Sequence, residues 1–266
     1  MPVVCVAGAT GWTGRPIAEA VLVADDLTLG GAVARAAAGQ DLGVAWGGAA
    51  NGVTVSGDLA EALAGVDVLV DYTSPDSALA HAMLAIAAGV HVVIGTSGLS
   101  AAQFADIDSA ARQAGVGVVA AGNFSLTAAM AQAAALLVAP FLPQREIIDY
   151  ASAAKPDAPS GTARELAERL GGVSSHQLAV PVSDTVGYPE ARGADIAGTQ
   201  VHSLRLPSFV VSTEIVFAQP DERLIIRHDA GGTPTPYVAG TLIAVRTVPG
   251  IVGLVRGLDT LLLGRN

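Results

Sequence analysis

The stretch VVCVAGATGWTG, residues 3–14, decides the fold of this chain. Its first part is a short run of small apolar residues, which is typical of a parallel strand buried on both faces. Gly8, Gly11 and Gly14 follow at once and open a helix expected from about residue 13 to residue 24. Glycine is required where such a turn is tight, where the backbone approaches a pyrophosphate, and where the helix packs on the strand. The stretch therefore predicts a dinucleotide-binding loop, to which we also assign Thr10, Trp12 and Thr13.

The end of the second expected strand indicates which dinucleotide is bound. An acidic residue about 20 positions after the glycines is the usual partner of the NAD ribose. That position is Ala34 here, and Arg35 follows it. Because a guanidinium pairs well with a phosphate, Arg35 favours NADPH over NADH. The alternative is that Arg35 is merely a solvated surface residue.

Strand and helix alternate through the first half of the chain. Apolar runs predict the strands, and the residues between them have helical spacing; the strands are expected at 27–34, 66–73, 90–95 and 115–122, and the helices at 58–65, 77–89 and 100–114. This alternation predicts an α/β chain with an N-terminal Rossmann domain, a doubly wound parallel sheet. We expect this dinucleotide-binding domain to span residues 1–127.

The alternation of strand and helix ends in the second half of the chain, where strands follow one another with only one clear helix, at 160–170. The strands are expected at 146–152, 201–206, 212–218 and 223–230. Such runs predict a second α+β domain with a mostly antiparallel sheet, over residues 128–235. A helix beginning at residue 236, within the segment 236–266, is expected to return to the first domain.

Composition excludes several classes of protein. The net charge is −10 and only 14 residues are Lys or Arg, so a nucleic-acid surface is not expected. The apolar segment 126–142 is shorter than the ~20 residues of a membrane span and contains Gln132, which predicts a buried helix. The only cysteine, Cys5, is expected in the core, and the N-terminus lacks the pattern of a signal peptide. We therefore expect a cytoplasmic protein without a metal site.

The string KPDAPSGTA, residues 155–163, predicts an anion-binding site. Ser160, Gly161 and Thr162 open the helix that follows, and the N–H groups and hydroxyls at such a helix start hold anions. Lys155 adds a cation directly upstream. Together these residues predict a receptor for a small carboxylate.

Several motifs in the same order resemble the dihydrodipicolinate reductase family. Beside GATGWTG and KPDAPSGTA these are DYTSP at 71–75, GTSG at 95–98, GNFSLTA at 122–128, ARGADIAG at 191–198, VHSLRLPS at 201–208 and RHDA at 227–230. The resemblance covers almost the whole chain. It implies a homotetramer assembled through the second domain, and hydride transfer from NAD(P)H to an imine-bearing ring dicarboxylate of lysine biosynthesis.

The resemblance also assigns roles to individual residues. Lys155 becomes the expected catalytic residue, and the substrate contacts are expected from Thr96, Ser152, Ser160, Gly161 and Thr162. Further cofactor contacts are expected from Tyr72, Thr73, Gly95, Thr96, Asn123 and Phe124.

The chain departs from the family at its proton donor. The family pattern acid-x-His-His-x-His-Lys reads Asp149-Tyr150-Ala151-Ser152-Ala153-Ala154-Lys155 here. Ala151 stands where the general acid is expected, and general-acid help contributes about 10²–10⁴-fold to rate. Lys155 could donate the proton instead, or the substrate could already be a protonated iminium.

Three interpretations remain open from the sequence. The chain is a true family reductase, a paralogue that reduces a different imine or ketone, or a non-catalytic NADPH-binding descendant. Of its five histidines, only His202 and His228 on second-domain strands are candidates for the chemistry.

Overall fold

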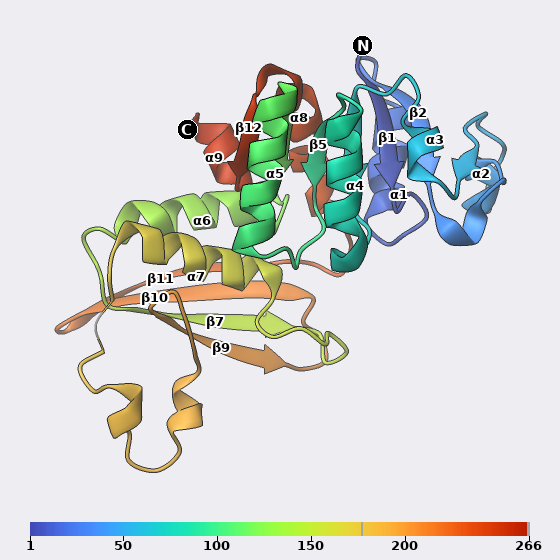
Figure 1. Cartoon of the computed structure of the whole chain (residues 1–266). Coiled ribbons are helices and arrows are strands. Elements are labelled where there is room, and N and C mark those ends of the chain that lie inside the picture. Colours follow the sequence, from blue (N-terminus) through green and yellow to red (C-terminus); the bar gives the residue numbers. More distant parts are fainter. Residues whose placement is uncertain (177, 265–266) are drawn as a thin grey trace. The chain divides into compact units, whose positions relative to one another are not determined.

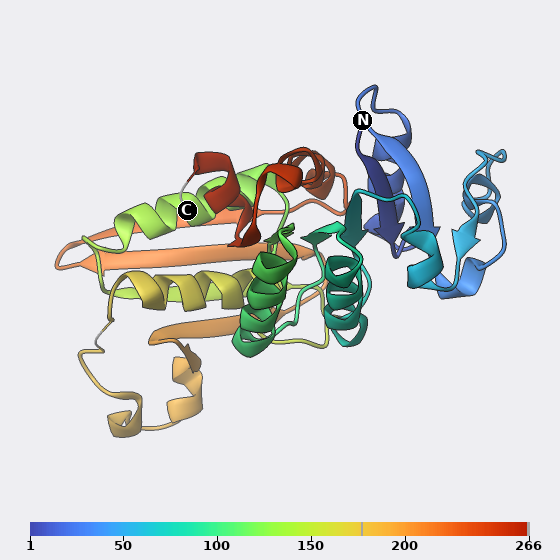
Figure 2. The same ribbon diagram turned by 45° about the horizontal axis from the view of Figure 1, so that its top comes forward.

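The computed structural model describes residues 1–176 and 178–264, which form two compact units. Unit 1 comprises residues 1–126 together with the chain from residue 234 onward, and unit 2 comprises residues 127–233. Figure 1 labels the elements of both units, and Figure 2 gives a second view.

Unit 1 is built on a seven-stranded sheet in which every neighbouring pair is parallel. In sheet order its strands are β12 (Gly253–Arg256), β6 (Gly117–Ala120), β5 (His91–Ile94), β4 (Val68–Asp71), β1 (Val3–Ala7), β2 (Thr28–Val33) and β3 (Val55–Ser56). The strands that follow β1 in the sequence are first added on one side of it (β2, β3) and then on the other (β4, β5, β6), as in a doubly wound fold. The expected Rossmann domain is therefore present.

Unit 1 also contains α-helices, most of which lie against the sheet. They are α1 (Gly14–Leu22), α2 (Leu42–Ala45), α3 (Leu59–Ala62), α4 (Pro75–Ala87), α5 (Ala101–Ala114), α8 (Pro236–Thr247) and α9 (Leu258–Leu263). Side chains of α3, α4 and α5 form one apolar core with β1, β4, β5 and β6, and this core contains the buried Cys5. Helix α8 packs against α1.

The C-terminal segment differs from the sequence expectation of a helix alone. After α8 the chain forms β12, which pairs with β6 at the sheet edge, and then the short helix α9. Four residues starting with a glycine were too short a run to be recognised as a strand.

Unit 2 is an α+β structure. Its five-stranded sheet has the order β11 (Glu222–Asp229), β10 (Val211–Gln219), β7 (Arg145–Ala151), β9 (Thr199–Arg205) and β8 (Ala194–Ile196). Only the β7–β9 pair is parallel, so the sheet is mostly antiparallel as expected. Helices α6 (Leu126–Val138) and α7 (Gly161–Val173) lie side by side over one face of it (Figure 1).

The expectation of a buried helix at 126–142 was wrong in part. Helix α6 buries Ala128, Ala129, Ala133 and Ala135, but Met130 is 42% exposed and Leu137 is 59% exposed. Small alanines let one face pack closely while the larger apolar residues remain outside. No helix in the described part of the chain is long and apolar enough to cross a membrane.

A buried arginine ties helix α7 to strand β7. The side chain of Arg145 is 2% exposed, and its guanidinium donates to Thr199 Oγ1 at 3.2 Å and Ser174 Oγ at 2.7 Å. It also donates to the carbonyl oxygens of Leu170 at 3.1 Å and Ser174 at 2.8 Å, at the end of α7. A cation at a helix C-terminus is favourable, and burial lowers the pKa of Arg145. The guanidinium therefore satisfies carbonyls that would otherwise be buried without partners.

Arg145→Met should lower the free energy of unfolding by about 2–4 kcal/mol, because several buried acceptors lose their donor. Urea denaturation followed by circular dichroism measures this difference. The matched control is Arg223→Met on β11, since Arg223 is exposed and should change stability little. Equal denaturation midpoints for the two variants would show that Arg145 does not hold α7 in place.

Candidate active site

The expected cofactor residues of unit 1 meet because neighbouring strands end in register. Ala7 pairs with Val33 of β2 and with Asp71 of β4, and Asp71 pairs with Ile94 of β5. Ile94 in turn pairs with Ala120 of β6. The residues that follow these strand ends therefore lie along one edge of the sheet: Gly8, Arg35, Tyr72, Thr73, Gly95, Thr96, Asn123 and Phe124.

The glycine loop has no room for side chains. Gly8 has a φ of 84°, and a Cβ atom there would overlap the carbonyl oxygen of Tyr72. A Cβ atom on Gly14, the first residue of α1, would overlap the carbonyl oxygen of Gly8. These are the close approaches that the glycine spacing predicts. A nicotinamide dinucleotide fits such a cradle, because its diphosphate needs exposed backbone N–H groups.

A groove runs along the loop. Five expected cofactor residues line it: Gly8, Thr10, Gly11, Arg35 and Thr73. Arg35 opens a short 3₁₀ helix after β2, and in the described chain its guanidinium makes no ion pair. The groove is also lined by residues that sequence reasoning did not single out, including Ser74, Ser77 and His81 of the β4–α4 connection and α4.

A buried carboxylate organises this edge. Asp71 is 0% exposed and accepts hydrogen bonds from the hydroxyls of Thr96, at 2.6 Å, and Thr73, at 2.8 Å. Its other oxygen lies 2.7 Å from Nδ1 of His81. Burial by itself raises the pKa of Asp71, but the hydrogen bonds from His81, Thr96 and Thr73 outweigh burial and hold the pKa below its ordinary value. Asp71 thus remains ionised, and it fixes two of the expected site residues.

Two of the expected cofactor residues, Tyr72 and Phe124, pack edge-on against each other. Phe124 is 1% exposed, so its side chain is enclosed in protein, whereas Tyr72 is partly exposed. The Tyr72 hydroxyl lies 2.8 Å from Thr241 Oγ1, and burial raises the pKa of Tyr72. Gly95 lies so close to the Tyr72 ring that a Cβ atom there would overlap it. The Phe124 side chain therefore supports the strand ends by packing.

Both tryptophans of the chain lie at the glycine loop. Trp12 belongs to the loop, is 55% exposed and packs edge-on against Tyr237. Trp46 follows α2 and donates from Nε1 to the carbonyl oxygen of Ala9, at 3.0 Å. Arg15 lies over the Trp46 ring and donates to its carbonyl oxygen at 3.1 Å. Sequence reasoning missed Trp46, because this contact joins residues 37 positions apart.

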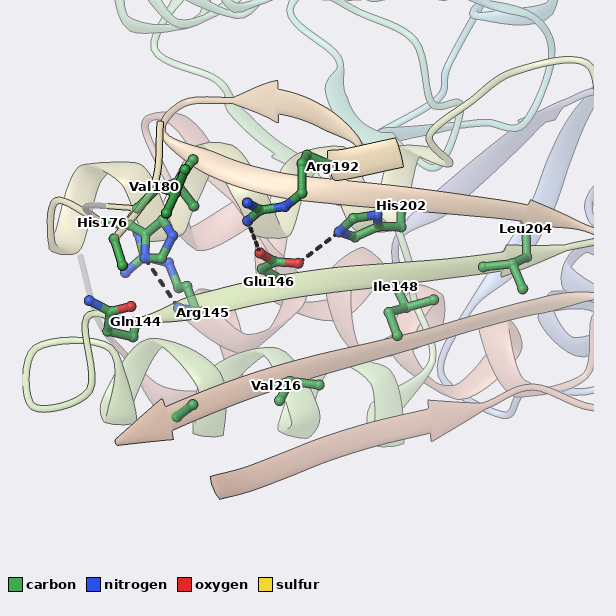
Figure 3. Close-up of a pocket in the computed structure, with 13 residues that line it drawn as sticks. Gln144, Arg145, Glu146, Ile148, His176, Val180, Arg192, His202, Leu204 and Val216 are labelled. Atoms are coloured by element: carbon green, nitrogen blue, oxygen red, sulfur yellow. Dashed lines mark hydrogen bonds and ion pairs between the residues drawn. The ribbon is translucent and has the colours of Figure 1, made fainter. Parts of the chain in front are cut away.

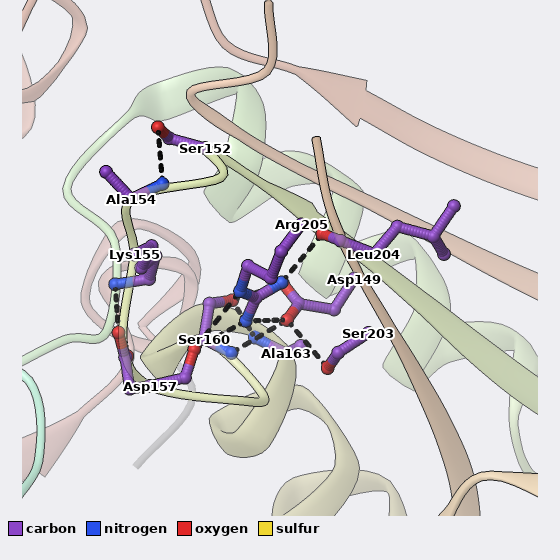
Figure 4. Close-up of polar contacts among 10 residues, drawn as sticks. All are labelled: Asp149, Ser152, Ala154, Lys155, Asp157, Ser160, Ala163, Ser203, Leu204 and Arg205. Carbon is purple, nitrogen blue, oxygen red and sulfur yellow. Dashed lines mark hydrogen bonds and ion pairs between the residues drawn. The ribbon is translucent and has the colours of Figure 1, made fainter. Parts of the chain in front are cut away.

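In unit 2 the anion-binding string is anchored by another buried carboxylate (Figure 4). Asp149 is 0% exposed and accepts from the backbone N–H of Ser160 at 2.8 Å and from its hydroxyl at 2.6 Å. Ser203 Oγ and Arg205 Nη2 donate to the same carboxylate, at 3.1 and 2.8 Å. Arg205 also donates to the carbonyl oxygen of Asp157, at 2.6 Å. The loop before α7 is thereby fastened to β7 and β9.

The structure corrects the role expected for Ser160. Its side chain is 2% exposed, donates to Asp149 and accepts from the Ala163 N–H at 3.3 Å as the N-cap of α7. The side chain of Ser160 is therefore committed to the support of the loop and the cap of α7. Gly161 and Thr162 begin the helix and are partly exposed.

Lys155 lies at the start of the same loop, with a side chain that is 27% exposed. Its Nζ is 2.8 Å from Asp157 Oδ1, within the string itself. Lys155 is also the only lysine in the sequence. Ser152 is partly exposed and accepts from the Ala154 N–H at 3.3 Å.

The positions that lack histidine differ in accessibility. Ala151 ends β7 and is 0% exposed, whereas Ala154 is exposed in the loop. Tyr150 packs against Phe209 and Arg227 rather than beside Ala151, as strand alternation predicts. His202 pairs with Glu146 and His228 lies 3.1 Å from Thr127 Oγ1. Neither histidine joins Lys155, and the described residues contain no cluster of His, Cys, Asp and Glu that could hold a metal.

A parallel sheet with a glycine cradle and a groove along it is typical of an oxidoreductase that binds a nicotinamide dinucleotide. The profiles described as dihydrodipicolinate reductase, N-terminus, and dihydrodipicolinate reductase, C-terminus, match residues 2–124 and 122–261. The chain belongs to the dihydrodipicolinate reductase family.

Individual relatives are similar over their whole length. The chain is 38% identical to a 4-hydroxy-tetrahydrodipicolinate reductase of Synechococcus elongatus, over 98% of each chain. It is 37% identical to one of Moorella thermoacetica, over 97% of each. The structure resembles a dipicolinate-bound dihydrodipicolinate reductase of Paenisporosarcina sp. TG-14, with a TM-score of 0.77 and 29% identity, over 98% of this chain and 99% of that one. This family membership places the chain among the reductases of the diaminopimelate and lysine pathway.

Proposed function

We propose that this protein reduces 4-hydroxy-tetrahydrodipicolinate with NADPH, with Lys155 as the group that binds and protonates the substrate. The observation that carries the proposal is that the chain contains a glycine-cradled groove lined by Arg35 in unit 1 and, in unit 2, its only lysine in the loop before helix α7. Relatives that match this chain over almost their full length are named for this reaction.

The preference for NADPH rests on charge in the groove. Arg35 lines it without an ion pair in the described chain, and Ala34 offers no carboxylate to a ribose hydroxyl. An unpaired guanidinium is well suited to a 2′-phosphate, because it can donate two parallel hydrogen bonds. An NADH-specific site would place an acid at this strand end.

The retention of a lysine supports a role in proton transfer. Thirteen of the 14 basic side chains are arginines, and the exception lies in the anion-binding string. A guanidinium is not deprotonated in proteins, whereas an ammonium can release a proton. When bound, the reduced nicotinamide supplies a hydride to the substrate. Lys155 holds a proton for the substrate's imine nitrogen, and Asp157 orients the Lys155 ammonium.

We also propose assembly into a homotetramer through unit 2, in the cytoplasm. One face of its sheet is hollowed by a cavity that is lined by the apolar side chains of Ile148, Leu204 and Val216 and, beside them, by the polar Glu146 (Figure 3). Glu146 pairs with His202 at 2.8 Å and Arg192 at 2.9 Å. Partly exposed apolar side chains beside polar ones suit a protein–protein interface.

Arg35→Ala should narrow the preference for NADPH. The wild type is expected to bind NADPH more tightly than NADH, and loss of a charge-assisted contact should weaken NADPH by roughly tenfold to a hundredfold while NADH changes little. Calorimetric titration with both cofactors measures this. Equal affinities in the wild type would contradict the proposed preference.

Lys155→Met should lower kcat/KM by about a hundredfold or more, while NADPH affinity stays within twofold. The matched control is His202→Gln, because His202 pairs with Glu146 and should leave turnover nearly unchanged. An amine-selective reagent gives a second test, since Lys155 and the N-terminus are the only amines it can label. A larger loss of kcat/KM in His202→Gln than in Lys155→Met would show that the site is misplaced.

On freshly generated 4-hydroxy-tetrahydrodipicolinate we expect a rate about 10²–10⁴-fold below that of a histidine-bearing relative, because no histidine acid stands at position 151. Spectrophotometric oxidation of NADPH measures the rate. An ordinary enzyme rate would mean that Lys155 or another donor fully replaces the acid. No turnover, together with activity on another cyclic imine, would favour the paralogue.

The substitution Ala151→His is poorly suited to restore the acid. Ala151 is fully buried, so the surroundings of the larger imidazole ring would have to move.

A further inference from the structure

One titratable pair at the cofactor groove has no part in the proposed function. Asp71 is the last residue of β4, and His81 lies on the second turn of α4. Asp71 Oδ2 and His81 Nδ1 are 2.7 Å apart, and the carboxylate is completely buried. A buried charge of this kind is costly unless its partners satisfy it, so the pair needs a physical explanation.

The carboxylate decides how the imidazole is oriented. An ionised Asp71 can only accept, so Nδ1 of His81 must carry the hydrogen in this contact. The other ring nitrogen, Nε2, makes no hydrogen bond within the part of the chain that the structure describes. The side chain is 23% exposed, and it lines the groove with Gly8, Gly11 and Arg35.

The elements that line the groove indicate which half of a dinucleotide lies near His81. Strands β2 and β4 flank β1, and the lining includes Arg35 after β2 together with Ser77 and His81 of α4, the helix that follows β4. In a Rossmann fold the end of β2 holds the ribose of the adenosine half. The imidazole therefore lines the same groove as the residue expected at the adenosine half.

We propose that His81 is a cofactor-binding residue that contacts the adenosine half of the dinucleotide through Nε2, with Asp71 as its positioning residue. This inference rests on the proposed binding of NADPH. A neutral imidazole with hydrogen on Nδ1 accepts from a ribose hydroxyl or the adenine amino group. Both groups are present in NADPH and in NADH, so His81 contributes affinity for both, whereas Arg35 discriminates between them.

The test is calorimetric titration of the full chain with NADPH, NADH and 2′,5′-adenosine diphosphate. His81→Ala should weaken all three by roughly tenfold, the effect of one hydrogen bond. The KM for NADPH should rise while kcat at saturating NADPH stays unchanged. The matched control is His91→Gln. His91 is the first residue of β5, at the end of the strand away from the groove, and it accepts from the Gly117 N–H at 2.8 Å.

Each outcome decides the inference. If His81→Ala binds all three ligands as tightly as the wild type, the proposed contact is wrong. If His81→Ala loses affinity for NADPH alone, the contact is not shared by the two dinucleotides. A loss for both dinucleotides but not for 2′,5′-adenosine diphosphate overturns the adenosine placement. If the wild type binds neither cofactor, it is the proposed function that fails.

The role of Asp71 is tested by a double-variant cycle. Asp71→Asn should weaken cofactor binding, and adding His81→Ala should weaken it no further, because the imidazole is no longer held by a carboxylate, whereas any loss through Thr73 and Thr96 is common to both variants of Asp71. Additive losses would show that Asp71 acts independently of His81. Thermal melting checks that each variant is folded, and His81→Ala alone remains decisive if Asp71→Asn is unstable.

Discussion

The common register of the strand ends in unit 1 is the constraint on which the site depends. Ala7, Val33, Asp71, Ile94 and Ala120 are linked in pairs across five neighbouring strands. The residues after them are therefore delivered to one edge, although they are far apart in the sequence. A slip of one residue in any strand would exchange the two faces of that strand and move its end away from the groove.

Local patterns were enough to predict the parallel sheet, the glycine loop and helix α7. Each of these depends on backbone conformation or hydrophobic period, which neighbouring residues determine. The contacts of Asp71 with His81 and of Trp46 with Ala9 were not predictable in this way, because they join ordinary residue types on different elements. Ser160 is an instructive case: the same hydroxyl chemistry suits an anion contact and a helix cap, and only its burial distinguishes the two.

The side chains that fasten the loop before α7 to strands β7 and β9 do not come from the positions where the family pattern has histidine. Asp149, Ser160, Ser203 and Arg205 hold the loop, and none of them is residue 151, 152 or 154. Substitution of those histidines therefore leaves the scaffold of the site in place. The loop can therefore keep its attachment to the sheet whether or not histidine stands at residues 151, 152 and 154.

The position of the two tryptophans has a consequence for how the protein can be observed. Trp12 lies in the glycine loop and Trp46 is hydrogen-bonded to it, and the sequence contains no other tryptophan. All indole emission of the chain therefore originates beside the cradle. Reduced nicotinamide absorbs light in the range where indole emits, so energy transfer between them would report occupancy of the loop. The chain thus carries an intrinsic optical probe at its cofactor site, without any label.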